Sequence, residues 1–434
     1  MKLFYYLEAI WNFFRIYIRL VFANNNHNSD EDFTRCRNLV DYAWQYIPAY
    51  RSLWTEHGFD PTMFNSLEDL KRIPIIDKNF VRDHCDSMIS HTYNQKRLSV
   101  VTTGGTTGMP MKFYIDNFMA RSKELAYQLW GSWYYWKHLQ GIDRVVTMRG
   151  YRVPQEKIEA KVFWERNKRE NGLLMSSFHI LEENYDIYIS KLREYKPKFI
   201  KAYPSSIVSL CTLMKRHGDV RIPGLKGIIC SSENVYDWQR RLIRDVLDVD
   251  IYSFYGHSEK AVCAFQNSKK EMEFIASYGH VEFLDEQGRD VRDKGHVAAV
   301  VVTGFDNKAF PFIRYNTNDF VEVASGNDIM TASCIVGREQ EFVYDKYGNK
   351  VPFTCSDEPI WGIDGIVAYQ YHQREQGCLE LLIQITSEFD KNSCQLILDR
   401  ARLVFVNFAI DILVVPEIER TVSGKFRYLV QNIC

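Results

Sequence analysis

The chain has 434 residues, of which 46% are hydrophobic and 14% aromatic, so it can bury sizeable cores and is too long for a single one. A formal net charge of −1 argues against the broad basic surface that nucleic-acid binding requires. The ten cysteines include no C-x-x-C pair, which favours buried, reduced thiols in a cytoplasmic protein over a disulfide framework.

The first predicted element is an amphipathic helix at the N-terminus, within a segment that we assign to residues 1–35. Residues 3–22 are strongly apolar, but they carry Glu8, Arg15 and Arg19 and lack a small-residue cleavage site. This pattern argues against a signal peptide and against a membrane-spanning helix. Two alternatives stay open: a helix packed on the protein, or an interfacial helix in peripheral contact with a membrane.

The second predicted domain covers residues 36–336 and begins as an alternation of helices and strands. The predicted helices are 121–139, 183–195, 207–216 and 238–246, and the predicted strands are 145–148, 199–203, 227–230 and 251–254. Such alternation predicts a mainly parallel sheet that is covered by helices. After about residue 278 the apolar residues alternate with polar ones around Gly288 and Gly295, which predicts an antiparallel, barrel-like part.

The third predicted domain is a small α+β unit from residue 337 to residue 434. Its predicted order is β, β, α, β, through residues 342–344, 379–386, 393–406 and 410–415. The expected fold class is therefore a large α/β N-terminal domain with parallel-type sheets and a barrel-like antiparallel part, followed by a small α+β C-terminal domain.

A glycine- and threonine-rich loop, T-T-G-G-T-T-G-M-P, follows the short apolar run 98–101. Glycines expose successive backbone N–H groups and threonines add hydroxyl donors, so the loop suits the wrapping of a phosphate chain. It is not a P-loop, because no Gly-Lys-Ser/Thr follows. An ordinary turn between two strands is the alternative.

Four further motifs fall at predicted strand ends or loops, where α/β proteins place their sites. In F-Y-G-H-S-E, Glu259 could hold Mg²⁺ beside phosphate oxygens, although a lone surface glutamate is commoner. In R-Y-N-T-N-D, Asp319 could accept hydrogen bonds from ribose hydroxyls or merely cap a turn. Arg338 stands at the predicted domain junction, and Lys425 lies in T-V-S-G-K; each could instead be a solvated side chain.

The order and spacing of these five motifs resemble those of the adenylate-forming, acyl-CoA synthetase-type superfamily. The segments I-P-A-Y-R at 47–51 and S-L-E-D-L-K-R-I-P at 66–74 resemble the phenylacetate–CoA ligase branch, and within it the CapK-type proteins linked to capsular polysaccharide synthesis. The resemblance extends from about residue 36 to residue 434. The chain departs from the family pattern at Asn318, where a glycine is usual, and at Gln340 in the hinge loop.

The resemblance implies a role for each matching position. The phosphate loop, which would wrap the β- and γ-phosphates of ATP, comprises Thr103, Gly104, Gly105, Thr106, Thr107 and Gly108. Glu259 would hold Mg²⁺, Asp319 would bind the ribose, and Arg338 would assist from the hinge. The residues flanking the adenine would be Ser232, Glu233, Tyr255 and Gly256. Lys425 would contact the α-phosphate and the carboxylate, so that Lys425, Glu259 and Thr106 form the implied catalytic set.

The acid pocket is expected to include His179, Tyr203, Ser205 and His257, which flank these sites; His179 could equally be a packed core histidine. Three functions stay open. The first is ATP-dependent activation of a carboxylic acid as an acyl-adenylate, followed by transfer to CoA or another thiol. The second is transfer of the activated group to an amine or hydroxyl in polysaccharide synthesis without free CoA. The third is a non-catalytic nucleotide-binding protein.

Overall fold

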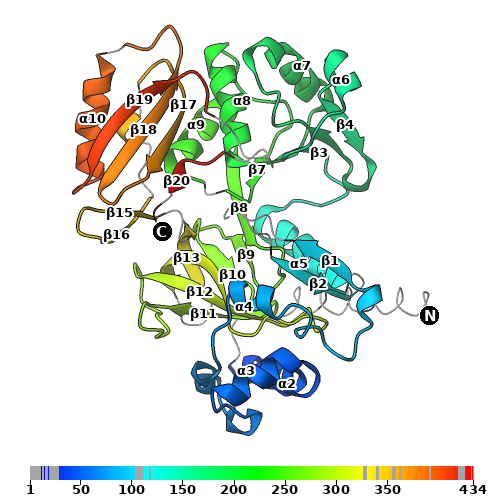
Figure 1. Cartoon of the computed structure of the whole chain (residues 1–434). Coiled ribbons are helices and arrows are strands. Elements are labelled where there is room, and N and C mark those ends of the chain that lie inside the picture. Colours follow the sequence, from blue (N-terminus) through cyan, green and yellow to red (C-terminus); the bar gives the residue numbers. More distant parts are fainter. Residues whose placement is uncertain are drawn as a thin grey trace. The chain divides into compact units, whose positions relative to one another are not determined.

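A computed structural model describes residues 29–102, 111–116, 119–233, 235–325, 330–338, 342–353, 358–360, 363–390, 392–418 and 426–431, together with residues 11, 14, 18 and 433. The phosphate loop 103–108 and Lys425 lie outside these residues, and for Arg338 only the backbone is described. The chain divides into two compact units (Figure 1). Unit 1 comprises Met1–Gln140 and Phe254–Ile335, and unit 2 comprises Gly141–Ser253 and Val336–Cys434.

Unit 1 is built on an antiparallel sheet. Its strands are β9 (Cys263–Gln266), β10 (Met272–Phe274), β11 (Gly279–Leu284), β12 (Val297–Gly304), β13 (Tyr315–Ser325) and β14 (Thr331–Arg338), in the order β11-β12-β13-β14-β10-β9. The end of β8 (Asp250–Gly256) pairs antiparallel with β9. The predicted antiparallel pairing is confirmed for β11–β12 and β12–β13, whereas closure into a barrel stays a prediction.

The remaining elements of unit 1 pack around one core. They are α2 (Ser29–Tyr46), α3 (Pro48–Glu56), α4 (Lys78–Asp83), α5 (Met119–Trp136) and the hairpin β1 (Ser99–Thr102) with β2 (Lys112–Ile115), joined by the 3₁₀ turns Pro61–Met63, Leu67–Arg72 and Gln95–Arg97. Trp54, Phe113 and Phe283 lie in the core, fully buried. Because α2 starts at Ser29, the predicted boundary at residue 35 falls inside a helix.

Of the N-terminal segment, Trp11, Phe14 and Ile18 are described as helical, and their side chains are exposed. None of the helices formed by the described residues is both long and apolar enough to cross a membrane.

Unit 2 begins with a mainly parallel sheet. Its strands are β3 (Val145–Met148), β4 (Trp164–Asn167), β5 (Gly172–Met175), β6 (Phe199–Ala202), β7 (Gly227–Cys230) and the start of β8, with helices α6 (Gln155–Glu159), α7 (Tyr185–Tyr195), α8 (Pro204–Arg216) and α9 (Asp237–Leu247) and the 3₁₀ turns Lys168–Glu170 and Glu182–Asn184. The pairs β3–β5, β3–β6, β6–β7 and β7–β8 are parallel, as predicted, and β4 adds an antiparallel edge.

Helix α8 shows how the sequence sets these elements. Pro204 occupies the first turn, where a missing N–H costs nothing, and Lys215 and Arg216 in the last turn complement the helix dipole. Ile207, Leu210 and other apolar residues of the same face are buried in the core of this sheet. Because α8 begins directly after β6, its N-terminus lies at the carboxyl edge of the sheet.

The C-terminal part of unit 2 is a second sheet, of order β19-β18-β17-β20, covered by α10 (Ser393–Val404) (Figure 1). Its strands are β17 (Ile366–Gln373), β18 (Cys378–Ile385), β19 (Ala409–Val415) and β20 (Leu429–Gln431); β15 (Phe342–Tyr344) and β16 (Lys350–Pro352) form a hairpin, and Glu358–Ile360 is a 3₁₀ turn. The predicted order β, β, α, β omitted β16, β17 and β20. A mobile domain from residue 337 stays a prediction.

Candidate active site

In unit 1 the end of β8 and the start of β13 bring two of the motifs together. The Tyr255 hydroxyl donates a hydrogen bond of 2.8 Å to the Asp319 carboxylate, and the Tyr315 hydroxyl donates one of 3.1 Å to Glu259 Oε1. Both carboxylates are buried, with 5% of Glu259 and 8% of Asp319 exposed. Residues more than fifty positions apart in the sequence thus form one acidic cluster.

His257 completes this cluster on the side of Glu259. Its Nδ1 lies 3.2 Å from Glu259 Oε2, and its ring meets that of Tyr315 edge to face. Both ring nitrogens are buried, and neither makes a hydrogen bond of good geometry to the described residues. The predicted substrate residue His257 therefore lies beside the predicted metal residue Glu259. Its ring nitrogens are available for a further hydrogen bond.

The electrostatic environment of Glu259 favours its charged form. Burial raises the pKa of the carboxyl, but the His257 ring, a backbone N–H and the Lys78 ammonium together outweigh burial and lower the pKa to about 2. Tyr315 and Lys78 were not among the predicted site residues. Tyr315 could have been found, because it is the second residue of the R-Y-N-T-N-D motif that also contains Asp319. Lys78 belongs to no motif that the sequence analysis singled out.

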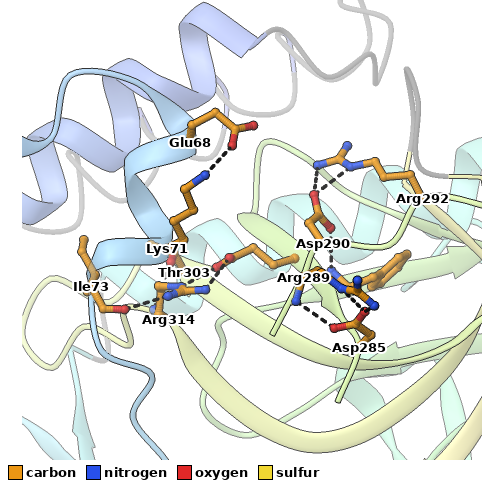
Figure 2. A network of polar contacts seen from close by, with 11 residues as sticks. Glu68, Lys71, Ile73, Asp285, Arg289, Asp290, Arg292, Thr303 and Arg314 are labelled. Atoms are coloured by element: carbon orange, nitrogen blue, oxygen red, sulfur yellow. Dashed lines mark hydrogen bonds and ion pairs between the residues drawn. The ribbon is translucent and has the colours of Figure 1, made fainter. Parts of the chain in front are cut away.

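The start of β13 is fixed by a buried ion pair. The Arg314 guanidinium donates to both Glu282 carboxylate oxygens, at 3.0 and 2.8 Å, and to the Ile73 carbonyl at 2.7 Å, while its backbone N–H donates to Thr303 (Figure 2). Ile76 flanks the next residue, since its N–H donates to the Arg314 carbonyl and its carbonyl accepts from Asn316. The motif that carries Tyr315 and Asp319 is thereby held in register.

In unit 2 the predicted residues gather where the parallel strands end. Glu233, after β7, accepts hydrogen bonds of 3.0 Å from both the backbone N–H and the hydroxyl of Ser205, in the first turn of α8. A carboxylate at this place is stabilised by the helix dipole and by otherwise unpaired N–H groups. Glu233 also accepts from the backbone N–H of Phe426, the residue that follows Lys425, at 3.2 Å.

The neighbouring predicted residues occupy the same edge. Tyr203 is the N-cap of α8, and Ser232 is exposed and has a left-handed backbone with φ of 71°, which is uncommon for serine. The His179 ring stacks on Phe163 and its Nδ1 lies 2.8 Å from the Ser176 hydroxyl. Burial lowers the pKa of His179. These contacts fit a packed histidine as well as a pocket residue, so its role stays a prediction.

One residue of this edge was missed. Arg149 directly follows β3, as Tyr203 follows β6, and the adjacent Gly150 N–H donates to Ser177 after β5. The signal that selected the other residues, a polar side chain directly after a buried strand, applies equally to Arg149.

The predicted adenine-flanking residue Gly256 ends β8 in unit 1. A Cβ added at this position would lie 3.0 Å from the Phe254 ring, so there is little room for a side chain.

No family model matches the chain. Among curated proteins, Protein CapK of Staphylococcus aureus is 25% identical over 384 residues, which are 85% of this chain and 81% of the relative. Phenylacetate-coenzyme A ligases of Pseudomonas putida and Thermus thermophilus are each 24% identical, over 80% and 82% of this chain and 78% and 81% of their own length. The resemblance that the motifs predicted, to CapK and the phenylacetate–CoA ligases, is confirmed.

The solved structures agree at the level of the fold. A 2-hydroxyisobutyryl-CoA ligase in complex with an acyl-AMP has a TM-score of 0.72 at 18% identity, covering 93% of this chain and 89% of its own. An anthranilate CoA ligase in complex with anthranoyl-AMP has a TM-score of 0.55 at 14% identity, covering 77% and 66%. The chain therefore has the mixed α/β fold of adenylate-forming ligases, with a large sheet.

Proposed function

We propose that this chain is an AMP-forming acid–thiol ligase, which activates a carboxylic acid as its acyl-adenylate and passes the acyl group to CoA or another thiol. The observation that carries the proposal is the cluster in unit 1, where hydrogen bonds from Tyr255 and Tyr315 orient the Asp319 and Glu259 carboxylates. The enzyme class agrees with that of the phenylacetate-coenzyme A ligases among the relatives.

The chemistry accounts for the kinds of residue that are present. A carboxylate oxygen attacks the α-phosphorus of ATP, the bond from that phosphorus to the bridging oxygen breaks, and pyrophosphate leaves. A thiol sulfur then attacks the acyl carbon, loses its proton and displaces AMP. Negative charge crowds the first transition state, so an ammonium group and backbone N–H donors lower its energy. Lys425 and the loop Thr103–Gly108 are the proposed donors, and Asp319 the proposed ribose ligand.

The surroundings of Glu259 fit a bound Mg²⁺. Its low pKa keeps the carboxylate ionised; Tyr315 donates to one oxygen and His257 lies 3.2 Å from the other, and carboxylate oxygens have further lone pairs that a metal can use. Mg²⁺ prefers one or two carboxylates together with substrate phosphate oxygens. When bound, the ion would neutralise phosphate charge, while Tyr315 and His257 keep the carboxylate oriented.

The contact between Phe426 and Glu233 supports a role for the C-terminal segment in the same reaction. The Phe426 N–H lies 3.2 Å from a Glu233 carboxylate oxygen, and the Gln239 side chain donates to the Tyr428 hydroxyl at 3.0 Å. Tyr428 also packs edge to face on Tyr236. The residues that follow Lys425 thus contact the strand-end edge that carries Ser205 and Glu233.

A second candidate concerns the acceptor rather than the activation. The resemblance to CapK-type proteins, of which Protein CapK matches 85% of this chain, implies as the alternative a transfer to an amine or hydroxyl in polysaccharide synthesis without free CoA. The two acceptors are distinguished by the compound that triggers AMP release after the adenylate has formed: CoA in one case, an amino or hydroxyl sugar in the other.

The test is pyrophosphate release from ATP and Mg²⁺ across aryl, fatty, hydroxy and amino acids. We expect release with one acid class, and a rate about 10²–10³ lower for Lys425→Ala, because a single donor to the transition state is lost. Lys346→Ala is the matched control, since Lys346 is exposed in the same C-terminal part and its ammonium lies over the Tyr347 ring. ATP binding without release for any acid would contradict the proposal.

A further inference from the structure

The strand-end edge of unit 2 carries a guanidinium that the proposed chemistry does not use. Arg149 follows β3, and its Nη2 makes a hydrogen bond of 3.3 Å to the Ile229 carbonyl. Its Nε is buried and has no hydrogen-bond partner among the described residues. Among the described residues no carboxylate forms an ion pair with this side chain, although the charge of Glu170 acts on it from further away and raises its pKa.

The charged groups around Arg149 either contact other residues or carry a positive charge themselves. Lys201 on β6 is largely buried and pairs with Glu170 at 3.6 Å. Glu233 accepts hydrogen bonds from Ser205 and Phe426. Burial lowers the pKa of Arg149 and that of Lys201, and the Arg149 charge lowers the pKa of Lys201 further. This edge thus holds two partly buried cations, Arg149 and Lys201, of which Lys201 pairs with Glu170.

Arg149 is partly buried and makes no ion pair with the described residues, so the desolvation of its charge is only partly offset, and a bound anion would offset it further. Arginine is the side chain that best recognises carboxylates and phosphates, since its planar group donates two parallel hydrogen bonds. In open α/β sheets, ligands bind outside the carboxyl ends of the strands, which is where Arg149, Tyr203 and Ser205 lie.

We infer that Arg149 binds a second anionic group on the acid substrate, so that the acid is dianionic: a dicarboxylic acid or an acid that carries a phosphate-type group. One carboxylate of the acid reacts with ATP, and the second group pairs with Arg149. This inference rests on the proposed function, because it names the class of acid that the ligase activates.

The first experiment measures binding without turnover. Titration calorimetry in the presence of Mg²⁺ and an α,β-methylene analogue of ATP, which cannot release pyrophosphate, compares benzoate with terephthalate and hexanoate with adipate. We expect the diacid of at least one pair to bind about 30-fold or more tightly than its partner, because a buried charge pair is worth about that factor. Including 4-phosphonobenzoate distinguishes a phosphate-type group from a carboxylate.

The variants separate recognition from structure. Arg149→Met should abolish the preference for the diacid while leaving binding of the monoacid unchanged, and Arg149→Lys should retain part of it. Arg144→Gln is the matched control, because Arg144 is exposed and precedes the other end of β3. Thermal unfolding of Arg149→Met should occur close to the wild-type temperature, since the side chain is only partly buried and loses a hydrogen bond of 3.3 Å to the Ile229 carbonyl.

Two results would overturn the inference: equal or weaker binding of the diacid in both pairs, or a loss in Arg149→Met that is the same for monoacids and diacids. Failure of the proposed function is separate and shows in the parallel assay. There, pyrophosphate release from ATP would be absent for every acid even though the calorimetric preference for the diacid is present.

Discussion

At the scale of single residues, Asn318 explains how the chain departs from the family pattern without losing the site. Its backbone has φ of 61°, in the left-handed region that glycine adopts freely and that asparagine tolerates better than other residues. Its N–H donates to the Asn316 side chain at 2.9 Å, and the next N–H, that of Asp319, donates to the Thr317 hydroxyl. The asparagine thus preserves the turn that presents Asp319.

Substitution at residue 318 tests this account. Asn318→Gly should leave both stability and ATP affinity near those of the wild type. Asn318→Val should destabilise the protein by about 1–2 kcal/mol, the cost of a left-handed conformation for a residue with a Cβ branch, and should weaken ATP binding by displacing Asp319. Thermal unfolding and nucleotide titration measure the two effects. Equal behaviour of the glycine and valine variants would contradict the account.

The pKa of Glu259 gives a pH dependence with a defined sign. Its folded-state pKa, about 2, lies below the ordinary value of 4.5, so its contribution to stability is fully present above about pH 4.5 and is lost as the pH falls toward 2. Unfolding of wild type and Glu259→Gln should therefore be compared between pH 3 and pH 6. We expect the stability advantage of the wild type to shrink as the pH falls; an advantage that grows would contradict the depressed pKa.

At the scale of elements, one buried ion pair joins β11 to the residue that precedes β13. Arg314 and Glu282 are 4% and 7% exposed, and their contacts hold the segment from which Tyr315 and Asp319 extend into the site. Such a pair adds little net stability compared with an apolar replacement, but breaking it leaves a charge buried without a partner.

The expected pattern is non-additive. Arg314→Met alone should destabilise the protein by about 3–5 kcal/mol, whereas the double variant Glu282→Leu with Arg314→Met should recover most of that loss. Thermal unfolding midpoints of the wild type, both single variants and the double variant form the required cycle. If the loss of stability in the double variant equalled the sum of the losses in the two single variants, Arg314 and Glu282 would not act as a unit.

The element scale also shows what the sequence could predict. Strands 145–148 and 227–230 were predicted with the bounds of β3 and β7, because short, mostly apolar runs between polar segments are typical of buried parallel strands. β17 and β20 were missed: β17 mixes apolar and polar residues without strict alternation, and β20 has three residues and depends on pairing with β17. Pairing between distant segments leaves no local signal.

The candidate site follows the same logic. Glu259 and Asp319 could be predicted because each ends a recognisable motif. That Tyr255 and Tyr315 orient them could not, because these hydrogen bonds join residues 64 and 56 positions apart. Arg149 carried the positional signal of a strand end, but two facts about it come only from the structure: its Nε has no hydrogen-bond partner among the described residues, and the nearby Glu170 pairs with Lys201 instead.

At the scale of the whole molecule, each unit carries residues that we propose for the reaction. Glu259, Asp319 and His257 lie in unit 1, and Ser205, Glu233 and Arg149 lie in unit 2. The C-terminal segment that follows Lys425 contacts Glu233 within unit 2. The central claim that joins these residues is that the chain forms an acyl-adenylate before any acceptor binds.

The most direct test of that claim is acid-dependent exchange of labelled pyrophosphate into ATP, measured with Mg²⁺ and without CoA or any other acceptor. Formation of the adenylate is reversible, so exchange reports the first half-reaction alone. The account predicts exchange that requires one class of acid and is lost in Asp319→Ala. Absence of exchange for every acid, while ATP binds, would contradict it, as would exchange that proceeds equally well without an acid.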